Sequence, residues 1–229
     1  MDGVSRLFAA KSLLRSSHCS IVSKRITSLY CTGSFQPELK KTINSLDSDK
    51  VAALPTETVY GLGGNAYSKN SIQKIFNLKG RPKSNPLIVH YYSLEKALDD
   101  IVINENLKKL YKYFCPGPIT FILKKKINSK IHPLACAKLD TVAVRFPKHK
   151  IIRSILKKIK YPLAMPSANK STSVSPVQAA DVFEELGKKV KIIIDGGKCK
   201  VGIESTVIDL CTFPKILRPG IINKDKIQN

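Results

Sequence analysis

The 229-residue sequence has no tryptophan, and aromatic residues make up only 7% of it. Proteins that bind single-stranded nucleic acid use aromatic side chains as stacking platforms, so this scarcity argues against a module that reads bases. No apolar run approaches the roughly 20 residues that a membrane-spanning helix needs. We therefore expect no membrane partner for this chain.

Metal-binding and nucleophilic signatures are also missing. None of the six cysteines belongs to a C-x-x-C pair, and none combines with histidine at zinc-finger spacing. The sequence therefore predicts no protein-held metal site, and free thiols in a reducing compartment. No Ser-His-Asp or Cys-His arrangement stands out, which disfavours a mechanism that uses a protein nucleophile.

Acidic residues are scarce. The 17 Asp and Glu face 39 Lys and Arg, which gives a formal net charge of +22. Residues 1–34 hold five bases and one acid, so 34 bases and 16 acids, a net +18, remain in residues 35–229. A basic domain favours polyanions such as nucleotides, RNA or anionic surfaces. The alternative is a lysine-rich composition without a partner.

The first segment, residues 1–34, differs from the rest. It combines spaced Arg and Lys with many serines, a few apolar residues and a single acid. This pattern is typical of a mitochondrial transit peptide. The alternative is an unstructured tail or a wrongly assigned start. We expect this segment to be disordered and to lie outside the fold, and we expect the protein in mitochondria and also in the cytoplasm.

Alternating helical and strand patterns fill residues 35–229. Apolar spacing and capping signals predict helices at 37–46, 71–78, 94–98, 105–113, 148–158 and 176–186, the third capped by Ser93 and the last by Ser175. Short apolar runs predict strands at 51–54, 86–91, 119–124, 142–146, 163–165, 191–195, 206–210 and 216–217. This order implies one α/β or α+β domain, a sheet covered by helices. There is no internal repeat.

Residues 53–90 carry the most informative pattern. A short apolar run ends at Pro55 and opens into T-E-T-V-Y-G-L-G-G, and a basic cluster, Lys79-Gly-Arg-Pro82, follows. In an extended segment Lys79 and Arg81 point to one face, and Pro82 holds Arg81 in that geometry. Such cations suit phosphate oxygens. Solvated surface charges are the alternative.

These motifs, with further blocks in order, resemble the YrdC family, the threonylcarbamoyl-AMP synthases. The blocks are P-G-P-I-T (116–120), T-V-A-V-R-F-P (141–147), P-S-A-N (166–169), D-G-G (195–197), E-S-T-V-I-D (204–209) and L-R-P-G (217–220), and the resemblance spans about 38–222. It implies a twisted, open, mixed sheet flanked by helices around a basic cavity. Some members carry a further C-terminal domain, which this chain is expected to lack.

The resemblance implies a reaction that joins L-threonine, bicarbonate and ATP into threonylcarbamoyl-AMP and pyrophosphate. A transferase complex would use the product to make t6A at position 37 of tRNA. Mg2+ is implied by the triphosphate. Weak binding of tRNA by the basic surface is a further expectation. Two rivals remain: a non-catalytic RNA-binding module with the same fold, and a carbamoyl-adenylate domain of a metal-centre maturation enzyme.

The resemblance also assigns residues. Lys79 and Arg81 would be catalytic. The nucleotide would contact Lys79, Arg81, Asn85, Thr141, Ser167, Asn169, Ser175 and Arg218. Threonine would contact Thr58, His90, Arg145, Met165 and Ser205.

Three of these residues have a second interpretation from the sequence itself. An arginine on an apolar strand is costly unless it is paired, which favours a functional Arg145. His90 ends an apolar run and, taken alone, is typical of a core residue. Ser175 has a competing role as a helix N-cap.

The sequence also departs from the family at Thr172, where glycine is usual, so a positive φ there is expected to be harder to adopt.

Overall fold

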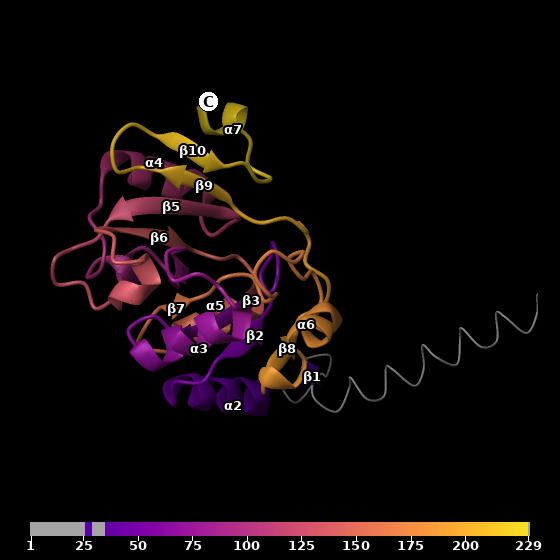
Figure 1. Ribbon diagram of the computed structural model, residues 1–229. Coiled ribbons are helices and arrows are strands. Elements are labelled where there is room, and N and C mark those ends of the chain that lie inside the picture. Colours follow the sequence, from indigo (N-terminus) through magenta and orange to yellow (C-terminus); the bar gives the residue numbers. More distant parts are fainter. Residues whose placement is uncertain (1–25, 29–34, 229) are drawn as a thin grey trace, which may run out of the picture.

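A ten-stranded mixed sheet organises the chain (Figure 1). The computed structural model describes residues 26–28 and 35–228. The strand order is β1-β8-β2-β3-β7-β4-β6-β5-β9-β10. The strands are β1 (Ile26–Ser28), β2 (Ala52–Leu54), β3 (Gly61–Asn65), β4 (Ile88–His90), β5 (Ile119–Lys124), β6 (Thr141–Arg145), β7 (Leu163–Ala164), β8 (Ile193–Asp195), β9 (Thr206–Asp209) and β10 (Lys215–Arg218).

Parallel and antiparallel strand pairs both occur in this sheet. The pairs β1–β8, β8–β2, β4–β6 and β5–β9 are parallel. The pairs β2–β3, β3–β7, β7–β4, β6–β5 and β9–β10 are antiparallel. The mixed, helix-covered sheet predicted from the sequence is therefore confirmed.

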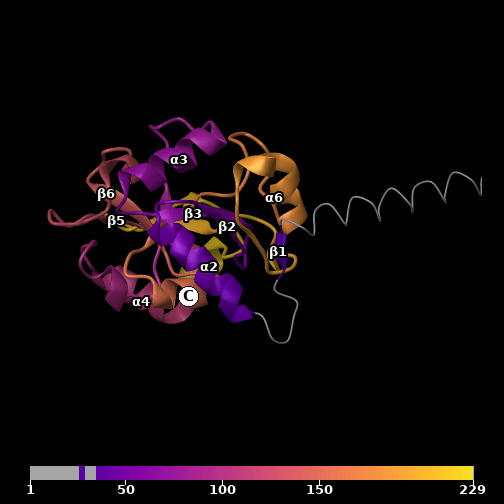
Figure 2. The same ribbon diagram turned by 90° about the horizontal axis from the view of Figure 1, so that it is seen from below.

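Helices cover both faces of the sheet, and in Figure 2 α2 lies in front with α3 above it and α4 below it. The α-helices are α2 (Phe35–Asp47), α3 (Lys69–Lys79), α4 (Glu105–Phe114), α5 (Lys150–Lys158), α6 (Ala179–Leu186) and α7 (Lys224–Gln228). Short 3-10 turns occur at η1 (Glu95–Ala97), η2 (Pro133–Cys136) and η3 (Gly187–Lys189). In the described part of the chain, no helix is both long and apolar enough to cross a membrane.

Two clusters of buried apolar side chains lie on opposite faces of the sheet. In β2, Ala53 joins one cluster, whereas Leu54 joins the other. Ile193 and Ile194 of β8 divide in the same way. Successive side chains of a strand point to opposite faces, so α3 packs against one face while α2 and α5 cover the other. The sheet is therefore buried on both sides near the segment that follows β2.

Strand β3 was not predicted, because glycines dominate it and glycine is depleted in strands. Here the missing side chains make room for neighbours. A Cβ on Gly61 would lie 2.6 Å from Met165 Cγ, and one on Gly64 would lie 3.2 Å from Ile75 Cδ1. The glycine run therefore brings β7 and α3 close to β3.

Two predicted helix starts are wrong. Residues 94–98 form only the 3-10 turn η1, which has no side-chain cap, so Ser93 is not its N-cap. Helix α6 begins at Ala179 with Gln178 as its N-cap, and Asp181 Oδ2 accepts a hydrogen bond from the Gln178 amide. The capping box thus lies three residues later than predicted, and Ser175 is free for another role.

The predicted targeting segment lies mostly outside the described residues. Its residues 26–28 form β1, which pairs in parallel with β8.

Thr172 adopts a φ of 77° despite its branched side chain, and its Oγ1 donates to the Ser171 carbonyl. Glycine is therefore not required at that turn.

Candidate active site

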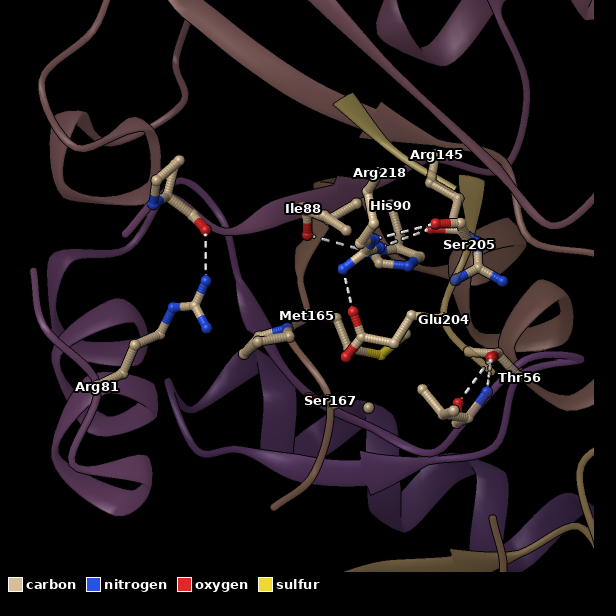
Figure 3. Close-up of a pocket in the computed structure, with 14 residues that line it drawn as sticks. Thr56, Arg81, Ile88, His90, Arg145, Met165, Ser167, Glu204, Ser205 and Arg218 are labelled. Carbon is tan, nitrogen blue, oxygen red and sulfur yellow. Dashed lines mark hydrogen bonds and ion pairs between the residues drawn. The ribbon is translucent and has the colours of Figure 1, made fainter. Parts of the chain in front are cut away.

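An open cavity lies where the ends of several strands converge (Figure 3). Strands β4 and β6 each end in it, with His90 and Arg145. Arg81 comes from the loop after α3, and Arg218 ends β10. The lining residues are Thr56, Val59, Gly61, Arg81, Pro86, Ile88, His90, Arg145, Met165, Pro166, Ser167, Glu204, Ser205 and Arg218.

Arg81 lies at one end of this cavity, opposite Thr56 (Figure 3). Its Nε donates to the Asn85 carbonyl at 3.0 Å, and its Nη2 donates to Asn85 Oδ1 at 2.6 Å and to the Pro86 carbonyl at 2.9 Å. The loop that follows α3 therefore fixes the guanidinium. Asn85 acts here through Arg81 and does not itself line the cavity.

Lys79 is placed differently from the prediction. It is the last residue of α3, and Gly80 caps the helix in the left-handed region with φ 60° and ψ 32°. Lys79 and Arg81 are therefore not neighbours on an extended segment, and the predicted extended geometry is wrong. Lys79 is 2% exposed and does not line the cavity.

The buried ammonium group of Lys79 joins α3 to the loop after β7. Its Nζ donates to the carbonyls of Ser167 at 2.6 Å and Asn169 at 2.5 Å, and to Asn169 Oδ1 at 3.3 Å. Burial, together with the nearby positive charge of Arg81, lowers the pKa of Lys79 to about 8. Ser167 lines the cavity, so Lys79 supports one of its walls from behind.

A second polar group surrounds Arg218 (Figure 3). The guanidinium forms an ion pair with Glu204, and it donates to the Ser205 carbonyl at 3.1 Å and to Ser205 Oγ at 3.2 Å. Ser175 Oγ donates to Glu204 Oε1 at 2.9 Å, so this serine supports the carboxylate instead of capping α6. Ser205 Oγ also lies 2.8 Å from Thr120 Oγ1.

Arg145 forms a third group and is buried. Its Nη2 donates to Glu57 Oε1 at 2.7 Å and to Thr58 Oγ1 at 2.9 Å. Its Nε has no hydrogen-bond partner in residues 26–28 and 35–228. A buried donor without a partner is costly. Arg145 is therefore paired through Nη2, as predicted for a buried arginine, whereas its Nε remains an unused donor among the described residues.

His90 stays uncharged at neutral pH. It is buried, and burial, with the positive charge of Arg145 nearby, lowers the pKa of the ring to about 3. Its Nδ1 lies 3.2 Å from the Ile88 carbonyl. A neutral imidazole beside a guanidinium adds a hydrogen-bonding group to the cavity without adding charge.

The structure brings seven of the predicted residues into the cavity. They are Arg81, His90, Arg145, Met165, Ser167, Ser205 and Arg218. Lys79, Asn85, Asn169, Ser175 and Thr58 do not line it. Asn169 accepts from Lys79, and each of the other four bonds directly to a lining residue. Thr141 does neither, because it begins β6, four residues before Arg145, and pairs with Lys124 of β5.

Sequence reasoning missed three residues: Thr56, Glu57 and Glu204. Thr56 lines the cavity, and its Oγ1 lies 2.9 Å from Thr58 Oγ1. Glu204 is the one carboxylate among the described lining residues. Both glutamates belong to the motifs P-T-E-T and E-S-T-V-I-D. Acidic residues are scarce in this basic chain, so a glutamate inside a motif was the signal that could have identified Glu57 and Glu204.

The described residues contain no group of three or more His, Cys, Asp or Glu that could hold a metal ion. Glu204, the carboxylate in the cavity, already pairs with Arg218 and accepts from Ser175. The side chains present therefore do not fit a resident Mg2+ site. A Mg2+ ion bound by substrate phosphates needs few protein ligands, so Mg2+ would accompany a triphosphate as part of the substrate.

The sheet and cavity define an α/β protein with a cation-rich site suited to a small anionic ligand. Comparison with known proteins gives the particular family: residues 44–220 match the family of Sua5, YciO and YrdC, described as "Telomere recombination", and the chain belongs to it. This confirms the resemblance seen in the sequence.

Two of the similar proteins carry the same name. The threonylcarbamoyl-AMP synthase of Pyrococcus abyssi is 45% identical over 183 residues, 78% of this chain and 53% of that protein. The Bacillus subtilis protein of the same name is 40% identical over 195 residues, 84% of this chain and 56% of that protein. A crystal structure of P. abyssi Sua5 with L-threonine has a TM-score of 0.80 and 42% identity, covering 83% of this chain and 56% of that one. The chain thus spans about half the length of these relatives.

Proposed function

We propose that this chain is a nucleotidyltransferase that condenses L-threonine, bicarbonate and ATP to threonylcarbamoyl-AMP and pyrophosphate. The observation that carries the proposal is one cavity lined by three arginines. Arg81 lies at one end of it, apart from Arg218, and the buried Arg145 keeps a free donor. Relatives at 40–45% identity are named for this reaction, and one of the similar structures is a complex with L-threonine.

The chemistry requires positioning and charge stabilisation more than a protein nucleophile. The threonine amine condenses with bicarbonate to form a carbamate, and water is released. A carbamate oxygen then attacks the α-phosphorus of ATP, the bond to the β-phosphate oxygen breaks, and pyrophosphate departs. Negative charge builds on the leaving group, so fixed cations near the phosphates lower the barrier.

The residues divide between the two substrates in this proposal. Arg81 and Arg218 hold phosphate oxygens, and Lys79 keeps the Ser167 wall in place. Arg145 holds the amino-acid carboxylate, beside the neutral His90. The product would pass to the enzyme complex that transfers threonylcarbamoyl to tRNA.

Calorimetric titration separates this proposal from its RNA-binding rival. The enzyme is expected to bind L-threonine and ATP each with one site, and both bindings should weaken when cavity residues are changed. An RNA-binding module would bind tRNA, with a strong salt dependence, and would not bind L-threonine. Absence of L-threonine binding would exclude the proposed reaction.

Replacing Arg145 with lysine is expected to weaken L-threonine binding by about 1–3 kcal/mol, because lysine keeps the charge but loses the planar fork. ATP binding should change little, since Arg81 and Arg218 are untouched. Titration calorimetry of both ligands measures this. Equal losses for the two ligands would place Arg145 in the nucleotide site or give it a purely structural role.

The rate constant kcat/KM for ATP is expected to fall as the pH rises through about 8, the pKa of Lys79. Above that pH the amine loses its proton, and with it the donors and charge that hold the carbonyls of Ser167 and Asn169. A pH profile of pyrophosphate release measures this. Lys79→Arg should move the fall to higher pH, and Lys83→Arg should not. An unchanged profile in Lys79→Arg would reject this role.

The protein is proposed to act in mitochondria as well as in the cytoplasm. Residues 1–33, fused to a fluorescent reporter, are expected to direct it to mitochondria, because basic, acid-poor segments suit import. A matched fusion with Arg6, Arg15 and Arg25 changed to glutamine should stay in the cytosol. An even cytosolic signal from the unchanged fusion would contradict the targeting function.

A further inference from the structure

Glu57 connects two parts of the structure that meet at the cavity. Its side chain is only 10% exposed and lies between Arg145, at the end of β6, and the start of α5. Oε1 accepts from Arg145 Nη2 at 2.7 Å. Oε2 accepts from the amides of Lys148 at 2.9 Å and His149 at 3.3 Å. Both oxygens are therefore used, each on a different element.

This double attachment limits the rotation of the Arg145 guanidinium. The amides at the start of α5 fix the carboxylate, so Oε1 holds Nη2 in one place. Thr58 Oγ1 accepts from the same nitrogen at 2.9 Å. Nη2 is thus held from two sides, while Nε has no partner in the described residues. The guanidinium is oriented by protein on one edge and left with an unused donor elsewhere.

From this geometry we propose that Glu57 is a positioning residue, which orients Arg145 to bind the carboxylate of the amino-acid substrate. The proposal rests on the function proposed above. Glu57 does not line the cavity, so it acts through Arg145. With Nη2 held in one place, the plane of the guanidinium is fixed, so its remaining N–H groups point in set directions, and a hydrogen bond to a carboxylate depends on those directions.

Electrostatics alone predicts the opposite effect. A carboxylate next to Arg145 reduces the attraction of that arginine for a second carboxylate. If charge dominated, removal of the Glu57 charge would strengthen binding of the amino acid. If orientation dominates, its removal weakens binding. The direction of the change therefore decides between the two.

The test compares L-threonine with L-threoninamide, which lacks the carboxylate charge, by calorimetric titration of the full chain. In Glu57→Gln only one accepting oxygen remains, so the side chain can keep its bond to Arg145 or its bonds to the α5 amides, but not both. L-threonine affinity should fall at least about tenfold, as expected for a weakened hydrogen bond to a charged group. L-threoninamide and ATP affinities should change little, so the preference for L-threonine over its amide should collapse.

Asp100→Asn is the matched control. Asp100 is a fully buried carboxylate that accepts from Tyr67 Oη at 2.7 Å and from Tyr91 Oη at 2.8 Å, and it does not line the cavity. This variant should lose stability but keep the preference for L-threonine. If Glu57→Gln does not fold, Glu57→Asp, which keeps the charge but is shorter, is titrated in the same way and should show the same selective loss.

Three results would overturn the proposal. Tighter L-threonine binding in Glu57→Gln would show that charge outweighs orientation. An unchanged preference for L-threonine over L-threoninamide in a folded variant would leave Glu57 with a structural role only, while the proposed function would stand. Absence of L-threonine binding by the unchanged protein would remove both the inference and the proposed function.

Discussion

Replacing Arg81 with alanine is expected to lower turnover at least about a hundredfold, a loss of roughly 2.7 kcal/mol of transition-state stabilisation. Three hydrogen bonds to Asn85 and Pro86 hold the guanidinium at one end of the cavity. A cation fixed before the reaction needs no reorganisation when charge builds on the leaving pyrophosphate. The effect should therefore be larger on kcat than on ATP affinity.

Lys83→Ala is the matched control for this prediction. Lys83 is exposed, lies two residues from Arg81, and does not line the cavity. Both variants remove one positive charge from the same loop. Pyrophosphate release at saturating L-threonine and ATP, with circular dichroism to verify folding, distinguishes them. Equal activities in two folded variants would mean that Arg81 does not bind the nucleotide.

Replacing Arg145 with methionine is expected to lower the free energy of unfolding by about 3–5 kcal/mol, the usual cost of removing one partner from a buried ion pair. Arg145 and Glu57 are 5% and 10% exposed, and their charged atoms lie 2.7 Å apart. The loss arises because Glu57 stays buried and ionised without its partner. Urea unfolding at neutral pH measures the difference.

The pH dependence of that loss provides a second check. In the unchanged protein, burial raises the pKa of Glu57, but Arg145 and the backbone amides outweigh it, so the pKa lies below its ordinary value of 4.5. Its contribution to stability is present above pH 4.5 and is lost as the pH falls through the lowered pKa.

In Arg145→Met burial dominates and the pKa of Glu57 should rise, so protonation on the way to acid relieves the destabilisation. The deficit of the variant should therefore be smaller at about pH 5 than at about pH 7. A deficit that does not depend on pH would mean that Glu57 is not the source of the loss. Arg153→Met, which removes an arginine that donates to the carbonyls of Tyr92 and Pro147, is the control without a carboxylate partner.

Periodicity predicted those elements that bury one clear apolar face. Strand β5 has the predicted bounds, and α5 begins two residues after its predicted start, because the side chain of His149 caps it. Strand β3 could not be predicted from propensity, because its glycines are there for what packs against them, Met165 and Ile75. Such contacts become visible only when distant segments meet.

In the candidate site, too, some features could be predicted from the sequence and others could not. The motifs identified side chains such as Arg81 and Arg218, which lie in one cavity. They could not show that Lys79, the last residue of α3, faces the carbonyls of Ser167 and Asn169, because α3 and the loop after β7 meet only in the folded chain. Nor could they show that Glu57 holds Arg145, 88 positions later in the sequence. Those partnerships depend on the fold.

The proposed reaction makes pyrophosphate release from ATP depend on two other substrates. The most direct measurement is pyrophosphate release by the purified protein with ATP alone, with L-threonine added, with bicarbonate added, and with both. Rapid release is expected only when both are present, together with formation of threonylcarbamoyl-AMP. Release that is the same without L-threonine, or no release with all three substrates, would contradict the proposed reaction.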